Sequence, residues 1–185
     1  MSWAADGSLL FSNSDRLLKL EASGKNQTQL LADPAALIYF FSSCGANYVV
    51  FSWFSHGGVS SSNVWRINAD GSSPLKLTEG KSDIFPVCSP DQKWVYYFGV
   101  GRGIYRVPLD GSSKSEAIFS IPQGYISRGQ MSVSPDGKTI ATVIEQADQP
   151  NIRLHCLNSD CRVRREYSMP TIINGACSLL PMGSL

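Results

Sequence analysis

The sequence predicts an all-β protein made of repeated four-stranded antiparallel sheets, and three observations carry this prediction. Residues 89–95 (SPDQKWV) recur 45 positions later as residues 134–140 (SPDGKTI). A second phrase, residues 63–71 (NVWRINADG), recurs as residues 103–111 (GIYRVPLDG). No stretch of about ten residues carries apolar side chains at helical spacing. Repeats of about 45 residues that contain only strands and turns are typical of β-propeller blades.

The first phrase joins a tight turn to a strand. In the turn, proline presets φ, aspartate accepts hydrogen bonds from its own backbone, and glycine adopts positive φ. The residues that follow, 94–98 and 139–144, are rich in aromatic and β-branched side chains and are predicted as strands. Asp-Gly pairs end the second phrase and predict another tight turn. The predicted structural turn residues are Asp6, Gly7, Asp70, Gly71, Pro90, Asp91, Asp110, Gly111, Pro135, Asp136 and Gly137.

These turns divide the chain into blades within a single β-propeller domain over residues 1–185. We place the blades at about 1–33, 34–80, 81–122 and 123–170, with a fifth beginning at 171–185. Stacking around a common axis buries both faces of each sheet. Four blades and the start of a fifth indicate a partial or open ring. Its first and last blades would expose apolar faces, so we expect self-association through them.

Composition limits the partners. The formal net charge is +1, which gives no broad attraction to nucleic acid or anionic membranes. No apolar stretch is long enough to insert into a bilayer. The first 20 residues lack a basic head followed by an apolar run, so we predict no secretory signal within them.

The five cysteines form no obvious disulfide framework. Cys44 and Cys88 stand beside predicted turns, where we expect small buried residues. Cys156 and Cys161 could clip a hairpin, although free thiols are the favoured interpretation. No cysteine or histidine spacing is typical of a zinc site, and we predict no metal or cofactor.

No catalytic constellation is found. The two histidines, His56 and His155, stand in a Gly/Ser-rich loop and in a strand, and the nucleophile-elbow pattern Gly-x-Ser-x-Gly is absent. Gly80-Lys81-Ser82 ends like a phosphate-binding loop, but the earlier glycine that such a loop requires is replaced by Leu75.

Two loops are the candidates for binding, because both join the second and third strands of a predicted blade. One spans residues 55–58 and contains His56, and the other spans residues 99–103 and contains Arg102. His56 and Arg102 are the side chains in these loops best able to make polar contacts with a partner. The aromatic residues Trp53, Phe54, Trp65, Trp94 and Tyr125 could instead line a sugar site, although we expect most strand aromatics to pack between blades.

The repeated phrases resemble the TolB-like propeller repeat, which combines a Ser-Pro-Asp-Gly turn, an apolar strand, an Asp-Gly turn and a Leu-Thr ending, here Leu77-Thr78. The resemblance covers residues 1–170. It is specific in the middle two copies and weak in the first. It departs from the pattern at Gly45-Ala46-Asn47, which replaces Pro-Asp-Gly, and at Met182, where aspartate is expected. It implies a bacterial, extracytoplasmic binding platform without chemistry of its own, as in periplasmic TolB.

The leading hypothesis is therefore a non-enzymatic scaffold that binds protein or peptide at the loop-lined end of the propeller. The alternative is a regulatory, sensory or substrate-gating propeller of a larger enzyme, such as a bacterial serine/threonine kinase or a prolyl oligopeptidase-type peptidase. A sugar-binding or glycan-processing propeller is a third possibility.

Overall fold

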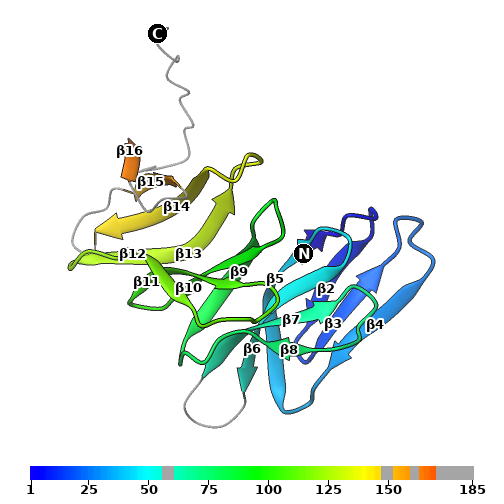
Figure 1. Cartoon of the computed structure of the whole chain (residues 1–185). Coiled ribbons are helices and arrows are strands. Elements are labelled where there is room, and N and C mark those ends of the chain that lie inside the picture. Colours follow the sequence, from blue (N-terminus) through cyan, green and yellow to red (C-terminus); the bar gives the residue numbers. More distant parts are fainter. Residues whose placement is uncertain (56–60, 147–151, 159–162, 170–185) are drawn as a thin grey trace, which may run out of the picture.

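A computed structural model of the chain describes the backbone of residues 1–55, 61–146, 152–158 and 163–169 (Figure 1). It describes the side chains of the same residues up to 145, apart from 128–130. Every element in this part of the chain is a strand or a turn, which confirms the all-β class. The predicted fifth turn, at 171–185, lies outside the described residues. No helix in the described part could cross a lipid bilayer.

Sixteen strands in the described residues form four antiparallel sheets of four strands, each with its strands in chain order. We call these sheets blades 1 to 4. Blade 1 contains β1 (Ser2–Trp3), β2 (Leu9–Asn13), β3 (Arg16–Leu20) and β4 (Gln27–Ala32). Blade 2 contains β5 (Ala36–Cys44), β6 (Tyr48–Ser55), β7 (Ser62–Asn68) and β8 (Leu75–Lys76). Blade 3 contains β9 (Asp83–Cys88), β10 (Trp94–Gly99), β11 (Gly103–Pro108) and β12 (Glu116–Ser120). Blade 4 contains β13 (Tyr125–Val133), β14 (Thr139–Gln146), β15 (Ile152–Asn158) and β16 (Val163–Met169).

The blades follow one another around an open arc, with blades 1 and 4 at its two ends (Figure 1). The first strands of successive blades contact each other, β1 with β5, β5 with β9 and β9 with β13. These strands therefore line the inner side of the arc, and later strands lie progressively outward. This arrangement is that of a partial β-propeller.

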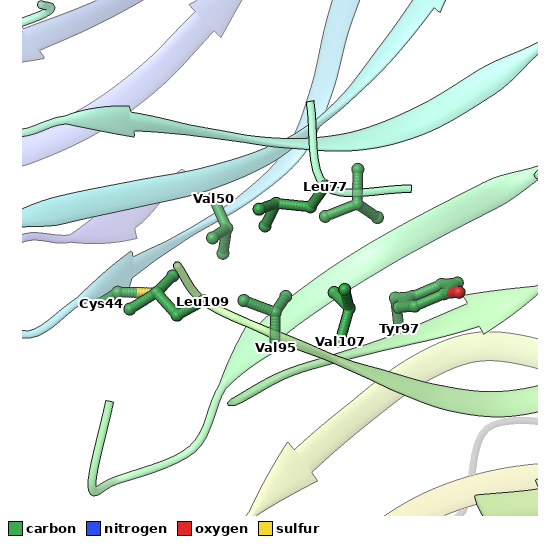
Figure 2. Close-up of a cluster of buried hydrophobic side chains, with 8 residues drawn as sticks. Cys44, Val50, Leu77, Val95, Tyr97, Val107 and Leu109 are labelled. Atoms are coloured by element: carbon green, nitrogen blue, oxygen red, sulfur yellow. The ribbon is translucent and has the colours of Figure 1, made fainter. Parts of the chain in front are cut away.

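Three clusters of buried side chains join successive blades. Figure 2 shows the cluster between blades 2 and 3, where Val50 and Leu77 face Val95, Tyr97 and Val107. In the next interface, alternate residues of β10 point the other way, and Tyr96 and Phe98 pack with Met131 and Ile140 of blade 4. The period of two along a strand thus supplies one apolar face to each neighbour.

The Ser-Pro-Asp turns close on themselves through side chains. The Ser89 hydroxyl donates to Asp91 Oδ1, which also accepts from the Lys93 amide at 3.1 Å. The Trp94 amide donates to Ser89 Oγ at 3.0 Å. Residues 134–139 repeat the whole pattern around Asp136. The serine hydroxyls lower the pKa of Asp91 and of Asp136, so both carboxylates stay charged as acceptors.

The Asp-Gly turns hold one blade against the preceding one. Gly71 has φ +88°, and a Cβ placed on it would lie 2.5 Å from the backbone oxygen of Leu30 in β4. The equivalent Gly111 packs against the side chains of Leu75 and Leu77 in blade 2. Glycine is thus required at Gly71 by both its conformation and its neighbour.

Cys44 and Cys88 form a disulfide between the last residues of β5 and β9, with their Cα atoms 5.5 Å apart. The expectation that these cysteines are simply small residues beside turns was wrong. Cys44 is fully buried as expected, but it is covalently linked to the next blade. The pairing arises because β5 and β9 are neighbours on the inner side of the arc. Cys161 and the side chain of Cys156 lie outside the described residues.

Candidate functional site

Strand direction places the binding loops at one end of the blades. Strands alternate in direction, so the turn between the second and third strands lies at the same end as the connection to the next blade. This end, called the loop face, carries residues 100–102, 77–82 and 121–124. The Ser-Pro-Asp and Asp-Gly turns lie at the opposite end, called the turn face.

Arg102 lies at the loop face, in the turn between β10 and β11. Its Nη2 atom donates to Asp83 Oδ1 over 2.6 Å, and the Asp83 side chain is only 1% exposed. The amide of Gly80 donates to Asp83 Oδ2 at 3.0 Å. The guanidinium carbon also lies 5.2 Å from the centroid of the Tyr105 ring. Arg102 is thus partly held by other residues of its own blade, while 44% of its side chain is exposed to solvent.

Gly99 makes room for this ion pair. A Cβ on Gly99 would lie 2.8 Å from the guanidinium carbon of Arg102, so a larger residue would displace the guanidinium.

The sequence analysis did not identify Asp83 as a site residue. The available signal was a carboxylate at the first position of an otherwise apolar inner strand, where burial requires a charged partner.

Tyr97 extends the network into the core. Its ring stacks on that of Tyr105 with centroids 5.7 Å apart, and burial raises the pKa of Tyr97 to about 12. Its hydroxyl shares a hydrogen bond with Ser115, and its ring packs in the cluster between blades 2 and 3. His56, the other predicted binding residue, lies outside the described residues.

An apolar cavity of about 500 Å³ opens at the loop face between blades 3 and 4. Gly99 and Gly101 form part of its wall, which places it directly beside the predicted loop 99–103. Two apolar side chains of its wall are prominently exposed, Val100 at 54% and Ile126 at 45%. The remaining lining residues are Ile84, Phe85, Phe98, Ile121, Tyr125 and Ser127. Sequence reasoning identified this loop through Arg102 and missed the apolar surface beside it.

Phe85 lines this cavity and also a second hollow along the inner strands β1, β5, β9 and β13. It lies at a β-bulge in β9 and has φ +56°, a conformation that a bulky side chain rarely adopts. Phe40 occupies the equivalent bulge of β5 with φ +49°, and the two ring centroids are 3.9 Å apart. Backbone strain of this kind is concentrated at functional sites in proteins. Here the two positive-φ residues place their aromatic rings in contact with each other.

The turn face has a different chemistry. A hollow of about 550 Å³ lies between the two Ser-Pro-Asp turns and includes Trp94 and Arg106 in its wall. The guanidinium of Arg106 covers the Trp94 ring at 4.2 Å and also pairs with Glu116. The carboxylates of Asp91 and Asp136 each accept hydrogen bonds within their own turns. Asp91 and Asp136 are thus engaged in holding the turns, and Arg106 is engaged with its neighbours on β10 and β12.

The candidate sugar-binding aromatics are distributed over four places. Phe54 packs edge-on against the rings of Tyr39 and Phe40. The rings of Trp53 and Trp65 are tilted by 31° with centroids 4.7 Å apart, and both pack against the core between blades 1 and 2. Trp94 belongs to the turn face, and Tyr125 lines the loop-face cavity. Within residues 1–55 and 61–145, side chains of His, Cys, Asp and Glu form no group of three that could hold a metal ion.

A scan of protein-family models finds no match to this sequence, and a search of curated proteins finds none either. Solved structures do match. Oligogalacturonate lyase in complex with manganese superposes with a TM-score of 0.72 at 12% identity, covering 88% of this chain and 50% of that one. The nidogen/laminin complex gives a TM-score of 0.68 at 15% identity, covering 87% and 61%. TolB from Acinetobacter baumannii gives 0.65 at 14% identity, covering 85% and 40%.

This chain therefore spans between two fifths and about three fifths of the length of each of these proteins. The superpositions establish a shared architecture. Because the sequence identity is low, the activities of these proteins are not transferred to this chain. The repeated four-stranded sheets, the inner strands along a common axis and these superpositions together identify the chain as a partial β-propeller with the fold found in TolB.

Proposed function

We propose that this chain is a non-enzymatic binding scaffold that receives an apolar segment of a protein or peptide in the loop-face cavity between blades 3 and 4. The observation that carries the proposal is the cavity itself. Its volume of about 500 Å³ is in the range of ligand sites, roughly 300–1,000 Å³.

The exposed apolar residues of the cavity wall favour a peptide over a small molecule. Val100 and Ile126 are both prominently exposed, so the apolar surface continues onto the loop face. A peptide would insert an anchor side chain beside Phe85 and cover Val100 and Ile126 with flanking residues. Anchors of this kind supply most of the binding energy at protein interfaces.

Arg102 supplies a polar contact near the cavity. Its guanidinium carries five N–H donors, and the contact with Asp83 uses one nitrogen. The exposed part of the side chain can receive a carboxylate or a backbone carbonyl of the bound segment. We therefore expect preferred peptides to place an acceptor next to their apolar anchor.

A phage-displayed library of random 12-residue peptides, selected on the immobilised full chain, tests the proposal. Selected sequences should share an apolar anchor. Ile126→Asp should weaken their binding, measured by fluorescence polarisation, by about tenfold or more, since losing an anchor contact costs about 2 kcal/mol. Trp3→Asp is the matched control, because Trp3 is 69% exposed but lies in blade 1. Unchanged binding to the Ile126→Asp variant would refute the site.

One observation favours the alternative, a propeller that forms part of a larger enzyme. This chain matches 50% of the length of oligogalacturonate lyase, whose name describes an enzyme. In this alternative the loop face would contact a catalytic region instead of a free peptide. The reading frame around this sequence discriminates between the two, because kinase or peptidase motifs would have to flank it.

We further propose that the protein works in an oxidising, extracytoplasmic compartment. The Cys44–Cys88 disulfide supports this, because such bonds persist mainly in secreted and periplasmic proteins. Mass spectrometry of the protein isolated from its native cells, with free thiols alkylated before lysis, measures the pairing. Alkylated Cys44 and Cys88 would argue for a reducing compartment.

A further inference from the structure

The connection from blade 2 to blade 3 contains residues 80–83, which directly precede the part of β9 that lines the cavity. We call these residues the connecting segment. On its blade 2 side this segment is tied to the start of β7. The side-chain amide of Asn63 donates to the Gly80 carbonyl, and the backbone amide of Ser62 donates to the Lys81 carbonyl at 3.2 Å. The connecting segment is thus fixed to a strand of blade 2.

The connecting segment also holds the turn between β10 and β11. The Val100 amide donates to the Ser82 carbonyl at 2.9 Å. Two residues further along, the Arg102 guanidinium donates to the carboxylate of Asp83, whose side chain is 1% exposed. This turn is therefore held at two adjacent residues of the segment, once through the backbone and once through a buried charge.

Arg102 joins three parts of the cavity wall. Residues 99–101, which belong to the wall, directly precede it. Its guanidinium reaches Asp83, the residue before Ile84, and its carbonyl accepts from the Ile121 amide at 3.2 Å. Ile84 and Ile121 both line the cavity. A displacement of Arg102 would therefore change the wall on more than one side.

The connecting segment includes Gly80-Lys81-Ser82, the sequence that ends like a phosphate-binding loop. In such loops, backbone amides bind phosphate oxygens. Here the Gly80 amide instead donates to Asp83 Oδ2 at 3.0 Å, and a Cβ on Gly80 would collide with the same oxygen. A carboxylate of the chain itself thus takes the position of an anion, and glycine allows its close approach.

We propose that Asp83 is a positioning residue of the loop-face cavity: by holding Arg102, it keeps the turn at residues 99–102 where Val100 and Gly101 form the cavity wall. Its effect on a ligand rests on the proposed function, whereas its effect on the turn does not. Because the Asp83 carboxylate is buried, it would act on a ligand through Arg102. Separating a buried carboxylate from its charged partner is costly, which makes the pair a firm anchor for the turn.

Amide hydrogen exchange, measured by NMR on the full chain, tests this inference without a ligand. Asp83→Asn keeps the shape of the side chain and removes the charge that Arg102 binds. The Val100 amide should then exchange about tenfold faster or more, since a hydrogen bond to a charged group contributes at least that factor. The Leu109 amide, which donates to the Lys93 carbonyl at the turn face of the same blade, should change much less. A general loss of stability would accelerate both amides by the same factor.

Two further variants serve as controls. Glu79→Gln is the matched one, because the ion pair of Glu79 also spans 2.6 Å but is exposed, and it should leave Val100 exchange unchanged. The double variant Asp83→Asn/Arg102→Ala should accelerate Val100 no more than the stronger single variant, since both substitutions remove one contact. Unchanged Val100 exchange in Asp83→Asn, or equal acceleration of Val100 and Leu109, would overturn the proposal.

Peptide binding gives the second readout. With a peptide from the phage selection, fluorescence polarisation should show that Asp83→Asn weakens binding by about threefold or more, within the range for residues that act without touching a ligand. Unchanged binding would refute the positioning role, and tighter binding would show that Asp83 competes with the ligand for Arg102. If the selection yields no peptide, the proposed function fails, and amide exchange still decides whether Asp83 positions the wall.

Discussion

The Arg102 guanidinium ties the β10–β11 turn to the first residue of β9 by donating from Nη2 to Asp83 Oδ1 over 2.6 Å. Removing the guanidinium would leave the Asp83 carboxylate buried, with the Gly80 amide still donating to its Oδ2 atom. We expect Arg102→Ala to lower the free energy of unfolding by about 2 kcal/mol, since hydrogen bonds to charged groups contribute about 1.5–3 kcal/mol. Urea denaturation of the two proteins measures the difference.

The Lys76–Glu79 pair provides a matched control. Its nitrogen–oxygen distance is also 2.6 Å, but the Glu79 side chain is 85% exposed. Exposed ion pairs contribute little, so Glu79→Gln should change stability by about 0.5 kcal/mol or less. Equal effects from the two substitutions would show that burial of Asp83 does not determine the strength of its ion pair.

The Cys44–Cys88 bond closes a segment with a sequence separation of 44 residues. A cross-link over a loop of that length removes about 4 kcal/mol of chain entropy from the unfolded state, although measured effects are commonly about 2–4 kcal/mol. We therefore expect the Cys44→Ser/Cys88→Ser double variant to lose about 2–4 kcal/mol of stability in urea denaturation. Dithiothreitol should destabilise the unmodified protein by a similar amount and leave the double variant unchanged.

The fold class was predictable because its signals are local and repeated. The Ser89–Asp91 hydrogen bonds arise within one turn, and the same residue types recur at Ser134 and Asp136. The strands between these turns alternate between two apolar faces, as Val95 and Tyr96 show. Each such signal can be found in a few neighbouring residues, and the period then assembles the blades.

The disulfide and the cavity depend on how blades pack, which no local pattern encodes. Cys44 and Cys88 pair because two inner strands run side by side, and spacing along the chain does not determine connectivity. Phe85 reaches the cavity wall through a bulge in β9 whose position follows from pairing with β10. The sequence predicted Arg102 as a charged residue of a binding loop. It did not predict the ion pair with Asp83, which lies 19 residues away in the sequence. These features follow from the tertiary structure.

Acid should destabilise blade 1 through Asp6. The hydrogen bond from Lys19, at 2.6 Å, lowers the pKa of Asp6 from 3.8 to about 2. A carboxylate whose pKa is lower in the folded state adds stability above its unfolded pKa, and that stability is lost as the pH falls toward 2. The urea midpoint of the unmodified protein should therefore fall more between pH 4 and pH 2 than that of Asp6→Asn.

Direct titration gives the second measurement of the same effect. Carboxyl-carbon chemical shifts should place the Asp6 midpoint near 2, and Lys19→Met should raise it toward the ordinary value of 3.8. An unchanged midpoint in the Lys19→Met variant would assign the shift to the Ser8 amide, which donates to Asp6 Oδ1 at 3.0 Å.

Gly71 and Gly7 separate the cost of backbone conformation from the cost of close packing between blades. Both have positive φ, +88° and +78°, so alanine at either should cost about 1–2 kcal/mol. A Cβ on Gly71 would also lie 2.5 Å from the Leu30 carbonyl oxygen, whereas one on Gly7 would have no atom within 4 Å. Overpacking adds about 1–3 kcal/mol, so Gly71→Ala should lower the urea midpoint clearly more than Gly7→Ala. Equal losses would mean that the Asp-Gly turn of blade 2 is free to move away from β4, and that the contact does not hold blades 1 and 2 together.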